Sequence, residues 1–358
     1  MKKLICLLLC LLALTVEARA AEVPKDVADA LPEQAEELME DTDTSDAQGF
    51  AAGVSRILEK MGGKAGDILR QRVRGAASIL LVVVLCGAID GFSQGTGGRA
   101  AAFLPMAGAL SVTLLTAGSL DALIGLGAET IGDLHTFSQV LLPTLAAATA
   151  ASGAVTTATF QQVTTVLFAD LLLSLMDGLL MPLVYLYIGV LTASACLPEN
   201  RLGAIADGLK KITTWLLTMS LLVFTVYLSV ARVISGGVDG ATVKVAKAAI
   251  SGVVPVVGGI IAEASETVLA GAGLLKNTIG VFGMLAILAT CAYPFLQLGI
   301  QYLLYKLTAF LAAAVGSPGL CKLIDGLGGA FGLVLGMTGS CALLLLISVL
   351  SSVAAVVP

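Results

Sequence analysis

The order of apolar and polar residues predicts an all-α, polytopic membrane protein. Apolar runs long enough to cross a bilayer recur from residue 75 to the C-terminal end, separated by short stretches with Gly, Pro or charge. We expect roughly six to eight spans in a membrane domain over 75–358. The expected spans cover 76–89, 103–120, 162–197 (kinked or double), 215–233, 278–315 (two spans or a bent pair) and 327–353. Residues 121–135, which carry three acidic side chains among apolar residues, are expected to form a connection at the membrane interface.

Two segments contain residues that interrupt a spanning helix. The stretch 253–283 carries Pro255, Gly258 and Gly259, and Pro143 interrupts the run LLPTLAAATAA. Proline lacks a backbone donor, and non-helical backbone persists at membrane depth only where protein or a water-filled cavity satisfies it. We therefore predict two proline-broken, re-entrant-like segments that together form a polar passage.

Four acidic residues are the candidate lining of this passage. Glu263 and Glu266 are three residues apart, and Asp170 and Asp177 are seven apart, so each pair shares one helical face. Ionisable groups at membrane depth face a cavity or a partner. The alternative is that the glutamates lie on an interfacial helix wetted by headgroups and that the aspartates lie near a water-exposed turn.

The prolines also indicate an internal repeat. Two pairs share a spacing of 39 residues, namely Pro143 with Pro182 and Pro255 with Pro294. The motif Asp-Gly-Leu recurs as well, beginning at Asp207 and Asp325, at an offset that requires a short insertion. We predict repeats over about 100–211 and 212–327, because many transporters build a central site between duplicated halves.

The last span carries a ladder of small residues. At four-residue steps the sequence places Gly328, Gly332, Gly336 and Ser340. Small residues in this pattern allow a second helix to approach closely.

The N-terminal 20 residues have the three parts of a secretory signal. A basic start is followed by a short apolar core and by Ala18-Arg19-Ala20, which predicts cleavage after Ala20. An uncleaved first anchor is the alternative. Cleavage would place residues 21–74 outside the cytoplasm.

Residues 21–74 fall into an acidic part and a basic part. Residues 21–49 are acidic and poor in large apolar side chains, which predicts a flexible or weakly helical segment. Residues 50–74 are basic with helical apolar periodicity and predict a short amphipathic helix. Arg70, Arg72 and Arg74 adjoin the first span, a pattern typical of a cytoplasmic end, which conflicts with a cleaved signal.

Composition excludes several classes of protein. The chain is 57% apolar and only 13% charged, too few charges for a soluble domain of 358 residues. Its seven cysteines and single histidine show no metal-binding spacing, and we expect no cofactor. Hydrolase, metalloprotease and phosphate-loop motifs are absent, so we expect no enzyme, and no basic patch with aromatics indicates nucleic-acid binding.

The segments LLPTLAAATAASGAVTTATF (141–160) and VVPVVGGIIAEASETVLAGAGLLKNTIGVFG (253–283) resemble the stage III sporulation protein AE family of endospore-forming bacteria. The resemblance implies a multi-pass mother-cell membrane protein in a channel or feeding complex that links mother cell and forespore. It also implies partners, namely other stage III sporulation A-operon proteins, including ATPase AA and ring protein AG, and the forespore stage II sporulation protein Q. It supplies no catalytic residues.

Two functions agree with these observations. The first is a transport or channel subunit, or the membrane base of a secretion-like apparatus, with the broken segments as its passage. The second is a scaffold that assembles the partners without conducting a substrate. Charge substitution at Glu263 and Glu266 distinguishes them, because only a conduit loses transport while the complex still assembles.

Overall fold

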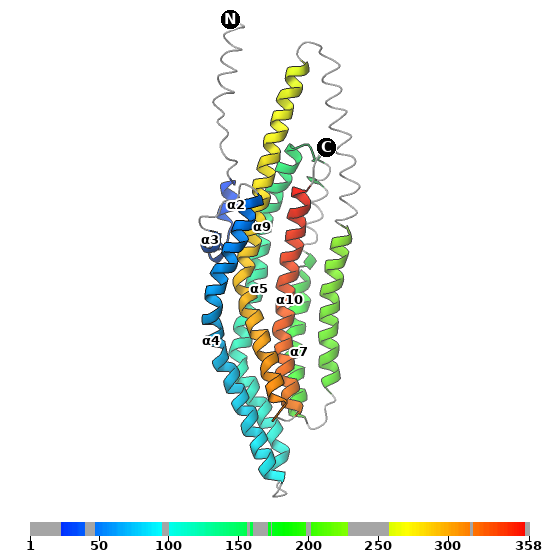
Figure 1. Cartoon of the computed structure of the whole chain (residues 1–358). Coiled ribbons are helices and arrows are strands. Elements are labelled where there is room, and N and C mark those ends of the chain that lie inside the picture. Colours follow the sequence, from blue (N-terminus) through cyan, green and yellow to red (C-terminus); the bar gives the residue numbers. More distant parts are fainter. Residues whose placement is uncertain are drawn as a thin grey trace.

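The structure is a computed structural model that describes residues 23–39, 47–94, 100–155, 158–159, 171–172, 174–197, 202–227, 258–315 and 318–354. Helices and turns account for these residues, and none of them belongs to a strand. The helices form an elongated bundle (Figure 1). Within the described ranges, six helices are long and apolar enough to cross a membrane. The all-α, multi-pass fold class is therefore confirmed.

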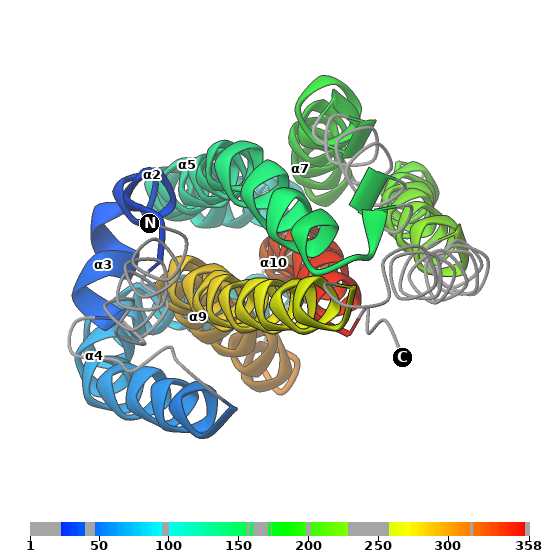
Figure 2. The same ribbon diagram turned by 90° about the horizontal axis from the view of Figure 1, so that it is seen from above.

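Two helices, α9 and α10, form the centre of the bundle. Both pack against α5, α4 packs mainly on α9, and α7 packs on α10 (Figure 2). The bounds of the elements are α2 Lys25–Asp29, α3 Glu33–Met39, α4 Ala47–Gln94, α5 Ala100–Ala151, the π-helical turn η1 Met176–Leu180, α7 Met181–Cys196, α9 Gly258–Ala312 and α10 Pro318–Val353. A further helix covers Gly203–Tyr227.

The helices are longer than the sequence predicts. The amphipathic segment 50–74 and the span 76–89 form one helix, α4, of 48 residues. Helix α5 has 52 residues and runs through 121–135, which we had expected to be an interfacial connection. That prediction is wrong, because the acidic residues of 121–135 are accommodated along one long helix and do not end it.

The predicted break at Pro143 is also wrong, since the proline lies inside α5. A proline in a helix disrupts hydrogen bonds to the carbonyls one turn before it, and neighbouring Thr side chains can replace them. Here the Thr144 hydroxyl donates to the Val140 carbonyl at 2.8 Å. Leu141 is fully buried and lies against Gly283 of α9. Packing on both sides of the proline thus holds the helix together.

Pro182 and Pro294, the second proline of each predicted repeat, do not occupy equivalent places. Pro294 lies within the 55-residue helix α9, so the expected division of 278–315 into two spans is wrong. Pro182 instead occupies the first turn of α7, directly after η1. A proline there removes a donor to the preceding turn, which favours an irregular turn at that place. The two prolines are therefore not structurally equivalent, and Pro255 lies outside the described residues.

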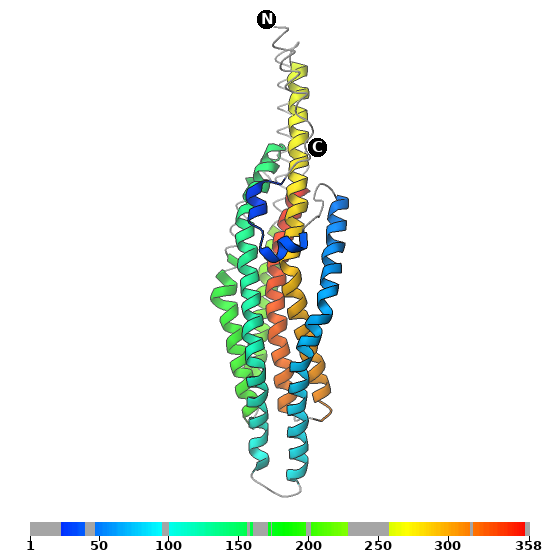
Figure 3. The ribbon, with the colours of Figure 1, turned by 90° about the vertical axis from the view of Figure 1, so that its left-hand side faces the viewer.

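The acidic N-terminal segment is more ordered than we expected. It forms α2 and α3, which lie beside α4, α5 and α9 (Figure 3). Leu38 is buried in the core, Lys60 donates to the Glu37 carbonyl at 2.6 Å, and Lys64 pairs with the Glu37 carboxylate at 3.3 Å. The acidic segment 21–49 and the basic segment 50–74 are thus in contact through these side chains. Residues 1–22, which include the predicted signal, lie outside the described part.

Candidate functional site

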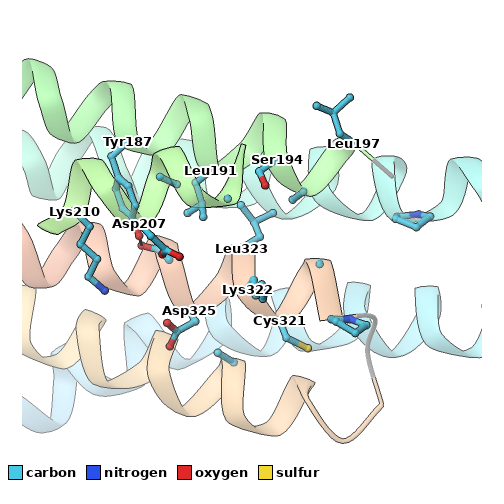
Figure 4. Close-up of a pocket in the computed structure, with 18 of the residues that line it drawn as sticks. Tyr187, Leu191, Ser194, Leu197, Asp207, Lys210, Cys321, Lys322, Leu323 and Asp325 are labelled. Atoms are coloured by element: carbon cyan, nitrogen blue, oxygen red, sulfur yellow. Dashed lines mark hydrogen bonds between the residues drawn. The ribbon is translucent and has the colours of Figure 1, made fainter. Parts of the chain in front are cut away.

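A cavity of about 740 Å³ lies near one end of the bundle, where several helices end or begin. Its walls come from α7, the helix Gly203–Tyr227, the end of α9 and the start of α10 (Figure 4). Five charged side chains line it: Asp207, Lys210, Lys306, Lys322 and Asp325. So many charges are unusual in a chain of this composition, and ionisable groups within membrane helices mark functional sites. We call this cavity the end cavity.

One ion pair crosses the end cavity from α9 to α10. The Lys306 ammonium lies 2.6 Å from the Asp325 carboxylate and also donates to the Asp325 carbonyl at 3.3 Å. The same ammonium lies 5.8 Å from the centre of the Tyr302 ring, which is attracted to a cation. The Lys306 side chain is thus held against the neighbouring helix α10 by both contacts with Asp325.

Glycines of α10 allow side chains from α7 and from the helix Gly203–Tyr227 to lie close to the α10 backbone. The Tyr187 hydroxyl of α7 donates to the Gly326 carbonyl at 2.9 Å. A Cβ at Gly329 would lie 2.9 Å from the Lys210 ammonium and 3.2 Å from the Tyr187 hydroxyl. A side chain at this position would therefore displace the Lys210 ammonium from its place above α10.

The two Asp-Gly-Leu motifs meet in the end cavity. Asp207 begins the first motif at the start of its helix, and Asp325 begins the second motif in α10, and both line the cavity (Figure 4). The recurrence seen in the sequence therefore corresponds to a spatial convergence. It does not establish the repeat, because the paired prolines occupy different places.

A second polar feature runs along α9 on the side that faces α4 and α5. Tyr293, Gln297, Gln301 and Tyr305 follow one another at four-residue steps and so share one helical face. Tyr293 lines a cavity of about 390 Å³ beside α3 and α4. We call these four residues the polar row. Over about 18 Å it leads from that cavity into the bundle.

The polar row has partners on both neighbouring helices. Arg72 of α4 donates to the Gln297 side chain at 2.9 Å, and the Tyr305 hydroxyl donates to Thr116 of α5 at 3.1 Å. Gln301 lies between these bonds and is 4% exposed. In the described part of the chain, its Oε1 atom and the Nε atom of Arg72 are buried without a hydrogen-bond partner. Such atoms are costly unless water or another polar group reaches them.

The predicted site residues are spread along the bundle. Pro294 lines a third cavity, of about 270 Å³, with Glu129 and Asp133, whereas Pro143 and Pro182 line none of the three. Gly258 and Gly259 open α9. Glu263 and Glu266 lie in α9 and Asp177 in η1, with their side chains outside the described part, and Asp170 is outside it altogether.

The predicted ladder on α10 is used in part. A Cβ at Gly328 would lie 3.0 Å from the Tyr305 Cβ, and one at Gly332 would lie 3.1 Å from the Tyr302 ring. Gly336 faces open space, and Ser340 donates to its carbonyl at 2.8 Å. The first two steps thus allow α9 and α10 to approach each other.

Comparison with known proteins decides the family. The model described as stage III sporulation protein AE (spore_III_AE) matches residues 36–356. The chain belongs to this family. A relative named stage III sporulation protein AE, from Bacillus subtilis (strain 168), is 24% identical over 252 residues, which is 69% of this chain and 62% of the relative's own length. No solved structure matches the chain.

Membership in the stage III sporulation protein AE family confirms the resemblance and is consistent with a role in sporulation. Of the two segments that carry the resemblance, residues 141–151 form the end of α5 and residues 258–283 form the start of α9. In this family member, the end cavity and the polar row both adjoin α9. This helix is therefore the common element of the polar interior.

Sequence reasoning missed the polar row. Gln297 and Gln301 stand four residues apart in the otherwise apolar stretch YPFLQLGIQYLLY, flanked by Tyr293 and Tyr305 at the same spacing. This spacing was a visible signal of a polar helical face. Among the residues that the structure describes, no group of three or more His, Cys, Asp or Glu side chains lies close enough to hold a metal ion.

Proposed function

We propose that this chain is a non-enzymatic membrane subunit of the complex that links mother cell and forespore, and that it contributes a polar route through its membrane base. The proposed partners are the other stage III sporulation A-operon proteins, including ATPase AA and ring protein AG, and the forespore stage II sporulation protein Q. The proposed location is the mother-cell membrane around the forespore.

The observation that carries the route is the polar row. Two glutamines and two tyrosines follow one face of α9, in a bundle whose core consists mainly of apolar side chains. Burying such groups reduces stability unless they are fully bonded, and Gln301 and Arg72 each keep one buried atom unbonded. A role in passing water, ions or polar solutes explains why the chain retains them.

Helix length supports the membrane base. Helices of 48–55 residues extend for about 70–80 Å, whereas the hydrocarbon core of a bilayer is about 30 Å thick. The bundle therefore extends well beyond one bilayer and offers surface to partners outside it. The same length favours the second function, a scaffold that assembles partners without conducting a substrate.

Replacement of both glutamines separates the two functions. In the Gln297→Leu, Gln301→Leu variant, the polar row becomes apolar at similar volume. We expect the chain to reach the membrane and to co-purify with its operon partners, while late forespore gene expression and heat-resistant spores are lost. Reporter activity in the forespore, spore counts and co-purification measure the three outcomes.

The control is Gln139→Leu, which makes the same chemical change on the exposed side of α5. It should leave spore formation unchanged. Normal sporulation of the double variant would contradict the route and favour the scaffold. Loss of co-purification together with sporulation would also favour the scaffold.

A further inference from the structure

The end cavity is lined by charged side chains and adjoins an exposed apolar surface of α9. A molecule with a charged head and an apolar tail can contact both. Of the five charged side chains that line the cavity, Lys306 and Asp325 form an ion pair with each other. The other three are Lys210, Lys322 and Asp207. Among the described residues, neither Lys210 nor Lys322 forms an ion pair. Two cations against one carboxylate leave the cavity with positive charge to offer to an anion.

The two lysines come from different helices. Lys210 lies on the helix Gly203–Tyr227 and Lys322 on α10, and both line the cavity (Figure 4). The Lys210 ammonium is close to Gly329, in a part of the wall where the absence of a side chain leaves room. A phosphate group has several acceptor oxygens, so it can accept from ammonium groups on two sides.

An exposed apolar stripe on α9 leads to the cavity. Leu303, Leu307 and Phe310 share one helical face and are 65%, 54% and 74% exposed, and Phe310 also lines the cavity. Large apolar side chains in this arrangement suit an acyl chain better than water. The stripe therefore distinguishes a lipid from a free anion.

The position of the cavity agrees with headgroup depth. Helix α7 ends at Cys196, α9 ends at Ala312 and α10 begins at Pro318, and residues next to all three ends line the cavity. The span Gly178–Cys196 is about as long as the hydrocarbon core is thick, so its end at Cys196 lies near the interface between water and hydrocarbon. Basic pockets between spanning helices bind lipid headgroups. We propose that the end cavity binds an anionic phospholipid, with its charged headgroup beside Lys210 and Lys322 and an acyl chain along the α9 stripe.

The test measures thermal unfolding of the purified full chain in a neutral detergent. Phosphatidylglycerol, phosphatidylcholine and inorganic phosphate are added separately at equal concentration. We expect phosphatidylglycerol to raise the midpoint by a few degrees, because a ligand that binds only the folded state stabilises it. Phosphatidylcholine and inorganic phosphate should have little effect. In the Lys210→Gln, Lys322→Gln variant, the shift with phosphatidylglycerol should disappear.

The control is Lys211→Gln, since Lys211 is exposed on the same helix and does not line the cavity. It should keep the full shift. Each variant is compared with itself without lipid, so a variant that is merely less stable still reports on binding. An equal shift with phosphatidylcholine, or an undiminished shift in the double variant, would overturn the proposal. An equal shift of the midpoint with inorganic phosphate would show that the lysines bind a soluble anion, and it would contradict the proposal that the ligand is a lipid.

Discussion

The central helix α9 and the outer helix α4 are similarly apolar but differ in what covers them. In the most apolar stretches of α9 and α10, 67% and 56% of the residues are buried within the protein. In α4 and the helix Gly203–Tyr227 the share is 17%. Apolar composition therefore identifies a membrane helix without indicating whether protein or lipid surrounds it.

The glycines explain much of this difference. In α10, a Cβ at Gly326, Gly328, Gly329, Gly332 or Gly339 would lie close to side chains of neighbouring helices. In α4, Gly62, Gly63, Gly66, Gly75 and Gly91 have nothing within 4 Å of that position. Small residues permit close approach only where a second helix is present. The outer face of α4 is thus available to lipid or to another subunit.

The largest effect is expected at Phe331, in the centre of α10. Its side chain is fully buried, and its ring meets that of Tyr305 edge-on at 5.2 Å. Phe331→Ala should lower the free energy of unfolding by about 3–5 kcal/mol, through lost burial and the cavity that remains. Phe92→Ala, in α4, removes the same group where it is 83% exposed and should change stability by less than about 0.5 kcal/mol. Thermal unfolding in detergent compares the two variants, and equal losses would show that α10 is not the core.

A smaller effect is expected from two glycines of α10. Gly328→Leu places a side chain against the Tyr305 Cβ, which cannot move without α9, and should cost about 1–3 kcal/mol through overpacking. Gly336→Leu places the same side chain in open space and should not destabilise the helix. Unfolding midpoints of the pair measure the difference. Equal midpoints would mean that the close approach of α9 and α10 contributes nothing.

The helical fold could be predicted from the sequence because it depends on local composition. The predicted spans 76–89, 103–120 and 327–353 each fall inside one helix, since long apolar runs have few other ways to satisfy their backbone in a membrane. The helix ends were wrong where the argument relied on proline alone. At Pro143, the Thr144 hydroxyl and the packing of Leu141 on Gly283 outweigh the local tendency to break. The packing on Gly283 comes from a distant segment and cannot be seen in the local pattern.

The candidate site was predictable only in fragments. The recurrence of Asp-Gly-Leu at Asp207 and Asp325 was visible, but its meaning depends on a tertiary contact between two helices. Glu263 and Glu266 remain predictions, because the structure does not describe their side chains. The polar row needed no tertiary information. It was missed because the prediction relied on charged residues, whereas all four side chains of the polar row are neutral.

The smallest effect is expected on α4, and it decides what covers this helix. Gly66→Ala adds a methyl group in open space within a helix and should raise the free energy of unfolding of the isolated chain by up to about 1 kcal/mol, because alanine favours the helix. The matched change in the same helix is Gly87→Ala, where the added Cβ meets the Val315 carbonyl oxygen and should destabilise the chain. If only lipid covers α4, Gly66→Ala leaves sporulation intact. If another subunit packs closely on Gly62 and Gly66, the same variant is more stable alone yet sporulates poorly and co-purifies with fewer partners.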